Sequence, residues 1–414
     1  MKEKIINLNE KPKFMLVLLC IIVVWAVRLF PFKFGGWNQI MLAFSYRYGF
    51  IQRAFIGSCI DVISTALHIP LKYMRYIYGI VTMLIFTSVM LLFAYKSQSK
   101  NGMDSQVKIF LQGLMLLFLL GPGWNTNYNN FALTDVWLLI VSITGMRAVM
   151  HEKNIWLAIV AAIMGELIHP AYVFLYFNLI LVVFCYRVWI DDKRNNHKIF
   201  AYLIITFIVD AILFIYMMFI AKAKPGVNLE EIMNRAAAIT NKTVPEISNH
   251  AITVKGYLLR EDNVNGIQFV INSYWLLFVV MILVFSPFIY ELFKYWRNIV
   301  KNAKLDSKIK ATAYALMPFG IITTIPMYIM HNDYGRWTYA AFFYEFAIIW
   351  MLNYVEDKNV VASTHVFMKC LRQHMLYYFF LMFYATMMGP FEQNLINPII
   401  SLIETIGWKI LGVY

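Results

Sequence analysis

Residues 199–221 read IFAYLIITFIVDAILFIYMMFIA, an apolar run in which Asp210 is the one charged side chain. As an α-helix, a run of this length extends about 30 Å, the thickness of the hydrocarbon core of a bilayer. Similar runs recur along the chain, and we expect each to be helical because backbone in lipid must satisfy its own hydrogen bonds. They lie at residues 14–32, 73–95, 132–150, 170–188, 269–293, 311–330 and 337–355, with weaker candidates at 107–121, 155–168, 375–390 and 395–413.

The composition agrees with lipid as the main solvent. Of 414 residues, 61% are hydrophobic and 14% are charged, which is more apolar surface than a soluble domain can bury. We therefore predict an all-α fold, a polytopic integral membrane helical bundle of about 11–12 transmembrane helices. One membrane domain, residues 1–414, is the simplest division.

The net charge of +13 would suggest nucleic acid as a partner of a soluble protein. Here Lys and Arg flank the apolar runs, so topology and anionic lipid headgroups explain them better, and we expect no nucleic-acid partner. The four cysteines share no metal-like spacing, and the sequence has no HExxH, Walker or dinucleotide-binding motif. We expect no metal site and no cofactor.

The Lys and Arg residues also predict the orientation. With the N-terminus in the cytoplasm and the first apolar run as a retained anchor, every predicted inner segment carries basic residues. The inner segments are 96–106, 151–154, 189–198, 294–310 and 356–374. The outer segments are 33–72, 121–131, 169–170, 222–268, 331–336 and 391–394.

Two outer segments are long enough to have structure of their own. Residues 50–69 are apolar on one side but carry Arg53 and Asp61, so we predict a re-entrant or interfacial helix near 50–69. Residues 222–268 form a long extracytoplasmic loop, in which Asn228 to Ala238 is typical of an amphipathic helix on a membrane surface.

Arginines in the first outer segment are the first candidate site. Arg47 and Arg53 are suited to gripping a phosphate or pyrophosphate with paired donors, and Gly49 and Gly57 would allow close approach of the backbone. The alternative is that both arginines reach anionic lipid headgroups. We favour the functional interpretation, because Arg in a short outer loop runs against the usual topological bias.

The densest polar cluster is HNDYGRW, residues 331–337. Asp333 or His331 is a candidate general base, and Tyr334 and Arg336 are candidate contacts to sugar or phosphate. The alternative is an internal Asp–Arg pair with Trp337 as an interface anchor.

Weaker candidates lie in the other outer segments. His169 precedes Pro170 between two apolar runs and is either catalytic or a buried structural residue. Asn125 and Asn129 belong to an amide-rich patch of the kind that binds sugars, although Asn is also a common turn former. Arg260 in the long loop either closes over a substrate or only solvates the loop.

At YRYGFIQRAFIG (46–57), LIHPAYVF (167–174) and NDYGRW (332–337) the sequence resembles Wzy-like bacterial polymerases of O-antigen or capsule repeat units, and more broadly the GT-C-like membrane glycosyltransferases. The resemblance implies an enzyme of the bacterial cytoplasmic (inner) membrane that uses polyprenyl-linked glycans at the outer face. It implies that Arg47, Arg53 and Arg336 handle the lipid diphosphate. It also implies polysaccharide export or chain-length-regulating proteins as partners, beside membrane lipid.

Three hypotheses stay open. The first is a surface polysaccharide polymerase acting on polyprenyl-diphosphate-linked repeat units. The second is a GT-C-like transferase with a polyprenyl-monophosphate sugar donor. Such enzymes carry an acidic residue early in the first outer loop, which residues 33–50 lack, so the polymerase is favoured. The third is a lipid-linked glycan flippase or other transporter, disfavoured by the absence of a sequence repeat and by polar residues biased to one face.

Overall fold

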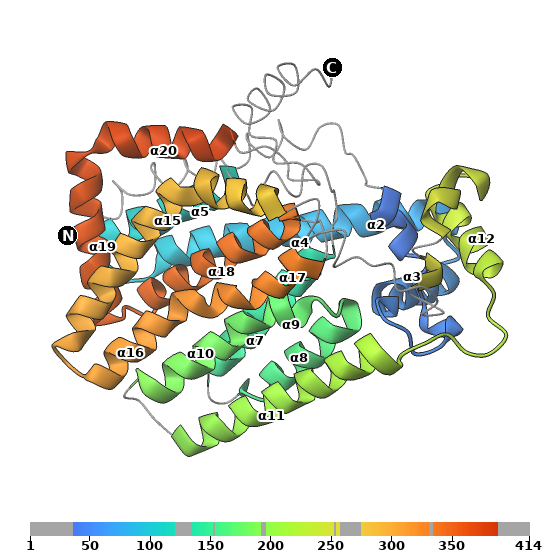
Figure 1. The fold of residues 1–414 in the computed structure, drawn as a ribbon, viewed down its shortest axis with the longest axis horizontal. Coiled ribbons are helices and arrows are strands. Elements are labelled where there is room, and N and C mark those ends of the chain that lie inside the picture. Colours follow the sequence, from blue (N-terminus) through green and yellow to red (C-terminus); the bar gives the residue numbers. More distant parts are fainter. Residues whose placement is uncertain are drawn as a thin grey trace.

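The computed structural model describes residues 36–120, 134–151, 154–191, 196–251, 254–256, 275–330 and 334–387, and over these residues it is all-helical, with no strand (Figure 1). The helices of the first half are α2 (Gly36–Met41), α3 (Ala54–Ala66), α4 (Leu71–Ser99), α5 (Ser105–Leu120), α7 (Asp135–Met150), α8 (Leu157–Ile168), α9 (Tyr172–Leu175) and α10 (Phe177–Trp189). Those of the second half are α11 (Asn196–Ile215), α12 (Leu229–Thr240), α15 (Trp275–Lys304), α16 (Lys308–Leu316), α17 (Ile325–Met330), α18 (Tyr334–Tyr354), α19 (Lys358–Gln373) and α20 (Met375–Met387). Short turns of 3-10 helix are η1 (Tyr46–Tyr48), η4 (Pro245–His250) and η5 (Met317–Thr324), and η3 (Tyr216–Ile220) is a π-helical turn.

Each apolar run predicted within these ranges is helical, which confirms the all-α prediction for the described residues. The run at 311–330 is interrupted by η5, where Pro318 and Gly320 interrupt the regular α-helix. A Cβ at Gly320 would lie 1.9 Å from the hydroxyl oxygen of Tyr344, which donates to the carbonyl of Met317 at 2.6 Å. The side chain of Tyr344 from α18 therefore occupies the space beside Gly320, where the regular helix is interrupted. The runs at 14–32 and 395–413 lie outside the described residues.

Segments predicted to share the inner side gather at one end of the bundle. Lys100, between α4 and α5, pairs with Glu356 at 3.0 Å, and Lys358 pairs with Asp306 at 2.8 Å. Asp357 accepts the N–H groups that begin α19 and also the hydroxyl of Tyr314 at 2.6 Å. Residues 356–374, predicted as a connecting segment, mostly form α19, which stands across this end (Figure 1).

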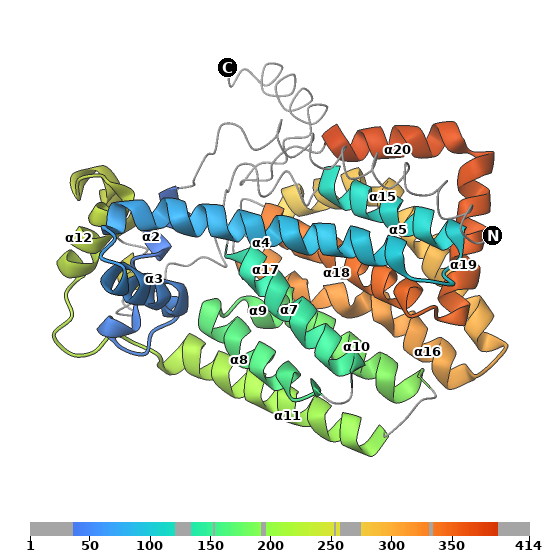
Figure 2. The ribbon, with the colours of Figure 1, turned by 180° about the vertical axis from the view of Figure 1, so that it is seen from behind.

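The opposite end carries a cap made of residues 36–69 and 221–256, in which α2, α3 and α12 lie together (Figures 1 and 2). Arg75 of α4 ties the cap to the bundle by donating to the side chain of Gln39 at 3.0 Å and to the carbonyl of Thr240. The helix predicted near 50–69 is α3, and it is a packed element of this cap.

The described part of the predicted loop 222–268 is largely folded. Its helix α12 is close to the predicted range, and Asn228 caps it by accepting the N–H of Glu231 at 2.7 Å. The prediction that this helix lies on a membrane surface was wrong in one respect, because its apolar side chains have protein partners. Ile232 and Ile239 are fully buried, and the helix packs on α2 and α4.

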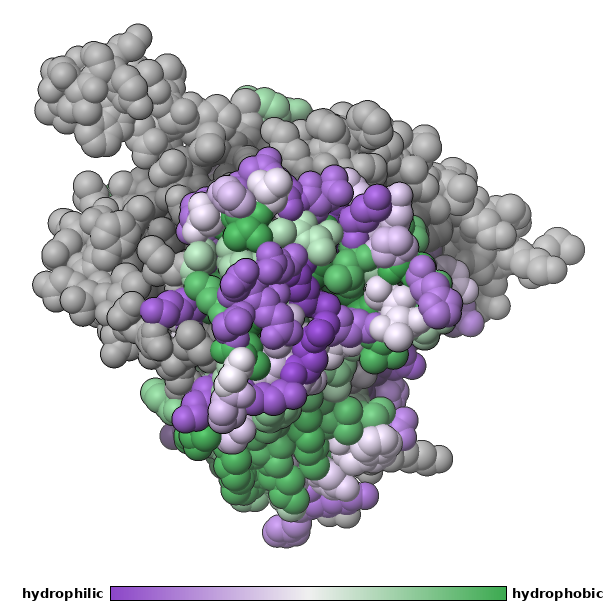
Figure 3. Space-filling model, turned by 90° about the vertical axis from the view of Figure 1, so that its right-hand side faces the viewer, coloured by the Kyte–Doolittle hydropathy of each residue, from purple (hydrophilic) through white to green (hydrophobic). Residues whose placement is uncertain are grey.

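The flanks of the bundle are apolar outside and polar inside. Along α11 the exposed side chains are Phe200, Ile204, Ile205, Phe207, Ile208, Ile212 and Ile215, whereas Thr206 and Asp210 are buried. Figure 3 shows the contrast between the polar cap end, which faces the viewer, and the hydrophobic surface below it, on the side of α11. Two described helical stretches, Leu71–Ser99 and His197–Ile220, are long and apolar enough to cross a membrane, and shorter apolar helices accompany them.

Candidate functional site

The most buried charges of the predicted site are an ion pair between the starts of two helices. Arg336, in the first turn of α18, donates from Nε and Nη2 to one carboxylate oxygen of Asp135 at 2.8 and 2.7 Å. Asp135 is the first residue of α7, where the helix dipole also favours a carboxylate. The Tyr176 hydroxyl donates to the other carboxylate oxygen at 3.2 Å. The pair therefore fixes α7 and α18 against the α9–α10 junction.

The ion pair between Arg336 and Asp135 is largely shielded from solvent. The Asp135 side chain is fully buried and that of Arg336 is 14% exposed. Trp337 is also buried, with its ring edge-on to Tyr328 at a centroid distance of 5.1 Å, so it is a packing residue rather than an interface anchor.

His169 lies in the turn between α8 and α9 and is 3% exposed. Its Nδ1 accepts the backbone N–H of Ala171 at 3.0 Å. An acceptor Nδ1 belongs to the neutral tautomer that carries its proton on Nε2. The histidine therefore stabilises the turn that Pro170 begins, which is the structural role considered from the sequence, and Nε2 keeps the only proton that it can donate.

In the cap, Asp61 of α3 and Arg235 of α12 form an ion pair. Arg235 is buried and also donates to the carbonyl oxygens of Ala43 at 3.1 Å and Gly57 at 3.4 Å. Asp61 accepts the Ser45 hydroxyl as well. The donors of Arg235 are therefore used inside the cap.

Arg47 and Arg53 have different surroundings in the cap. The Arg47 side chain is 55% exposed, lies 5.3 Å from the ring centre of Tyr48, and is 3.9 Å from Glu231. Arg53 is the residue before α3 and has a left-handed backbone, φ 62°, which is unusual for a side chain with a Cβ. Burial raises the pKa of Tyr48 although two guanidinium groups are close, so its hydroxyl stays a neutral donor.

Gly57 has the close approach that the sequence suggested, but its neighbour is the protein itself. A Cβ at this position would lie 1.8 Å from the carbonyl oxygen of Phe44. Only a glycine, which has no Cβ, allows α3 to pack this closely on the backbone at Phe44. The turn η1, which contains Arg47, therefore packs directly against α3.

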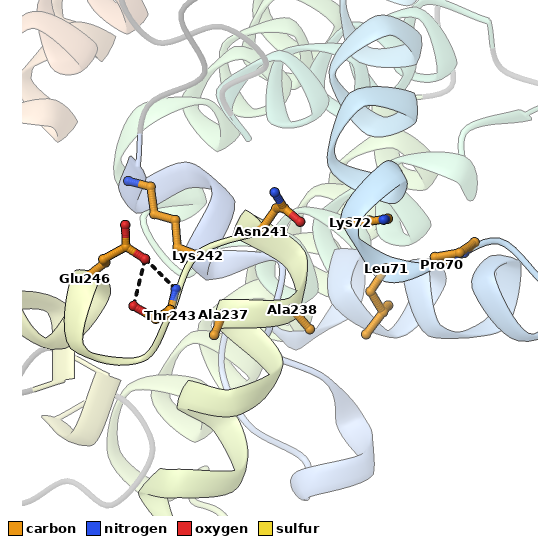
Figure 4. Close-up of a pocket in the computed structure, with 9 residues that line it drawn as sticks. All are labelled: Pro70, Leu71, Lys72, Ala237, Ala238, Asn241, Lys242, Thr243 and Glu246. Carbon is orange, nitrogen blue, oxygen red and sulfur yellow. Dashed lines mark hydrogen bonds between the residues drawn. The ribbon is translucent and has the colours of Figure 1, made fainter.

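A cavity of about 620 Å³ opens in the cap between the start of α4 and the end of α12 (Figure 4). Its polar side chains include Lys72, Asn241 and Lys242. Thr243 and Glu246 close one side, since Glu246 accepts the N–H and the hydroxyl of Thr243 at 2.6 and 2.7 Å. None of the residues predicted from the sequence lines this cavity.

Other predicted residues fall outside the described ranges: His331, Asp333, Asn125, Asn129 and Arg260. Tyr334 is the first residue of α18. The structure thus places Arg47, Arg53, Arg336 and His169 at or near the cap end, with Arg336 and His169 in the bundle and the other two in the cap.

Sequence reasoning missed the partners of these arginines. Neither Asp135 nor Tyr176 was singled out from the sequence. Their signal was weak but present, because an acidic residue at the start of an apolar helix needs a partner.

Comparison of the chain with models of known families, with curated proteins and with solved structures finds no match.

Proposed function

We propose that the chain is an integral membrane glycosyltransferase that extends surface polysaccharide from polyprenyl-diphosphate-linked repeat units at its cap end. The observation that carries the proposal is that two of the predicted arginines, Arg47 in η1 and Arg53 just before α3, lie together in the cap. One of them, Arg47, is half exposed and weakly paired.

The apolar flanks support a membrane location. Beyond the exposed His197 and Lys198 in the first turn of α11, the face that a soluble protein would make polar consists mainly of Ile and Phe, whereas Thr206 and Asp210 are buried. Water makes such a surface unfavourable and lipid makes it favourable. We take α4, α11 and the shorter apolar helices as spans of a multi-pass protein, with α19 lying along the cytoplasmic surface.

The charge of the cap supports an anionic substrate. In the cap, residues 36–69 and the described part of 221–256, there are seven Lys and Arg residues and four Asp and Glu residues, a net charge of +3. Membrane proteins tend to keep Lys and Arg out of outer segments, so an excess here indicates a use for positive charge. A diphosphate group is suited to it, because planar guanidinium groups pair with phosphate oxygens.

The proposed reaction is a glycosyl transfer. A hydroxyl of the acceptor glycan attacks the anomeric carbon of the donor, the bond from that carbon to the diphosphate oxygen breaks, and the polyprenyl diphosphate leaves with its electron pair. Arg47 and Arg53 stabilise the negative charge that develops on the leaving group. Asp333 or His331 takes the proton from the attacking hydroxyl.

The test uses Arg47→Ala and its matched control Glu231→Ala in cells that make the lipid-linked repeat units. Removal of a charge that stabilises the transition state costs on the order of 10²-fold in rate, so we expect R47A to leave short surface glycans. E231A removes the partner but keeps the cation, and we expect long chains. Normal chains with R47A at equal protein level would exclude Arg47 from the reaction, and equal loss in both variants would show that only their pairing matters.

A further inference from the structure

Two acidic side chains on neighbouring helices are buried inside the bundle, away from the arginines described above. Glu166 lies in the last turn of α8 and Asp210 lies in the middle of α11, which packs against α8. Both are almost completely buried, at 0% and 1% exposed, and their carboxyl groups interact electrostatically.

Among the described residues neither carboxyl has a basic partner, since no Lys or Arg there forms an ion pair with Glu166 or Asp210, in contrast to the buried Asp135. Both carboxyl oxygens of Glu166 also lack a hydrogen-bond partner of normal geometry in the described part of the chain, the N–H of Val173 being a looser contact. Within the described residues, therefore, neither a positive charge nor a well-placed donor compensates this carboxyl.

The negative charge of the two carboxyl groups indicates which ligand would bind them. Two ionised carboxylates without a counter-charge are strongly disfavoured in a low-dielectric interior, and they repel each other as well. Binding of a proton removes one of the two buried negative charges. We propose that Glu166 and Asp210 form a buried proton-binding site, in which protonation relieves the uncompensated negative charge of the two carboxyl groups.

Tyr172 of α9 lies near this site. Its buried hydroxyl is within electrostatic range of both carboxyl groups. Its ring lies directly on Gly165, where a Cβ would be 2.3 Å from a ring carbon. The glycine beside Glu166 therefore allows the tyrosine to approach the acid pair.

The other charged or titratable groups on the packed elements have partners elsewhere. Asp61 of α3 pairs with Arg235, Asp135 of α7 pairs with Arg336, and Arg187 of α10 pairs with Asp191. His169 is bonded to the N–H of Ala171 through Nδ1. The remaining groups are Arg147 at the far end of α7, Cys59 of α3, which is exposed, Cys185 and Tyr186 of α10, His197, Lys198 and Tyr202 of α11, and Tyr216 of η3.

The proton site does not depend on the proposed transferase activity. It sits between two helices of the bundle, so a change of its proton content changes the charge buried between them. The carboxyl Glu345 provides a matched control, because it is buried on another helix, α18, and accepts the indole N–H of Trp296 at 3.0 Å.

The experiment is infrared difference spectroscopy of the purified full chain in lipid nanodiscs, with wild type, E166Q/D210N and E345Q. We expect wild type in neutral buffer to show the carbonyl stretch of a protonated carboxylic acid. The double variant should lose a part of this signal that E345Q keeps. A double variant with the wild-type signal would overturn the proposal.

Thermal unfolding gives a second readout. A proton held only in the folded state stabilises it at low pH, and this stabilisation is lost as the pH rises. The melting temperature of wild type should therefore fall more steeply toward alkaline pH than that of E166Q/D210N. If the double variant does not fold, the wild-type spectrum still decides, because absence of any protonated carboxyl in neutral buffer contradicts a proton bound at Glu166 and Asp210.

Discussion

Arg336 and Asp135 are 201 residues apart in the chain and form a buried ion pair with a distance of 2.7 Å between Nη2 and Oδ2. The pair joins the starts of α18 and α7. Because Tyr176 donates to the same carboxylate, three helical elements meet at one charged group. Any substrate contact made by Arg336 is therefore coupled to the packing of the bundle.

We expect Asp135→Asn to lower the free energy of unfolding by about 3–5 kcal/mol, because it leaves the Arg336 guanidinium buried without a counter-charge. The double variant D135N/R336M should recover part of this loss, since it buries no unpaired charge. Melting temperatures of the purified protein in detergent measure both. A double variant that loses as much as the sum of the two single variants would show that the two residues do not interact.

The Asp61–Arg235 pair predicts a local effect. Arg235→Gln removes the ion pair and donors to the carbonyl groups of the cap, so we expect a loss of about 2 kcal/mol. Hydrogen exchange should become faster in residues 36–66 and remain unchanged in α18. The control is Arg47→Gln, whose exposed pair with Glu231 at 3.9 Å should contribute less than about 1 kcal/mol. Equal exchange in the two variants would refute a structural role of Arg235.

Substitutions at Gly57 and Gly113 distinguish close packing at a glycine from the low helix propensity of glycine. We expect Gly57→Ala to destabilise the cap, because its Cβ would lie 1.8 Å from the Phe44 carbonyl oxygen. Gly113→Ala in α5 meets no atom within 4 Å and should stabilise the protein by up to about 1 kcal/mol. Melting temperatures should move in opposite directions, and a G57A protein as stable as wild type would contradict the close approach.

The helices were predictable because each apolar run carries its own signal over about twenty residues. Their ends were also predictable in outline, since the Lys and Arg of 96–106 and 356–374 indicated a shared side, and Lys100 does meet Glu356. Side-chain pairing was not predictable. Arg336 had an acid three residues before it in the sequence, yet the described partner is Asp135 of a distant helix.

The cap shows a second limit of sequence reasoning. The segment 222–268 has a low hydropathy and few long apolar runs, which is typical of a loop. Its folded part depends on contacts with residues 36–66, chiefly those of Arg235 with Ala43, Gly57 and Asp61. Such contacts join segments about 180 residues apart, and a local pattern contains no information about them.

The membrane location and its orientation can be measured by cysteine labelling. In a variant without the four native cysteines, one cysteine is placed at Glu230 in the exposed part of α12, or at Leu305, which is 88% exposed between α15 and α16. Because the two positions lie at opposite ends of the helices, a bilayer around the apolar flanks separates them. We expect a membrane-impermeant maleimide to label the cysteine at 230 in intact cells, and the one at 305 only after permeabilisation. Equal labelling of both in intact cells would contradict a spanning arrangement, and labelling of 305 alone would reverse the orientation and remove the cap from the outer face.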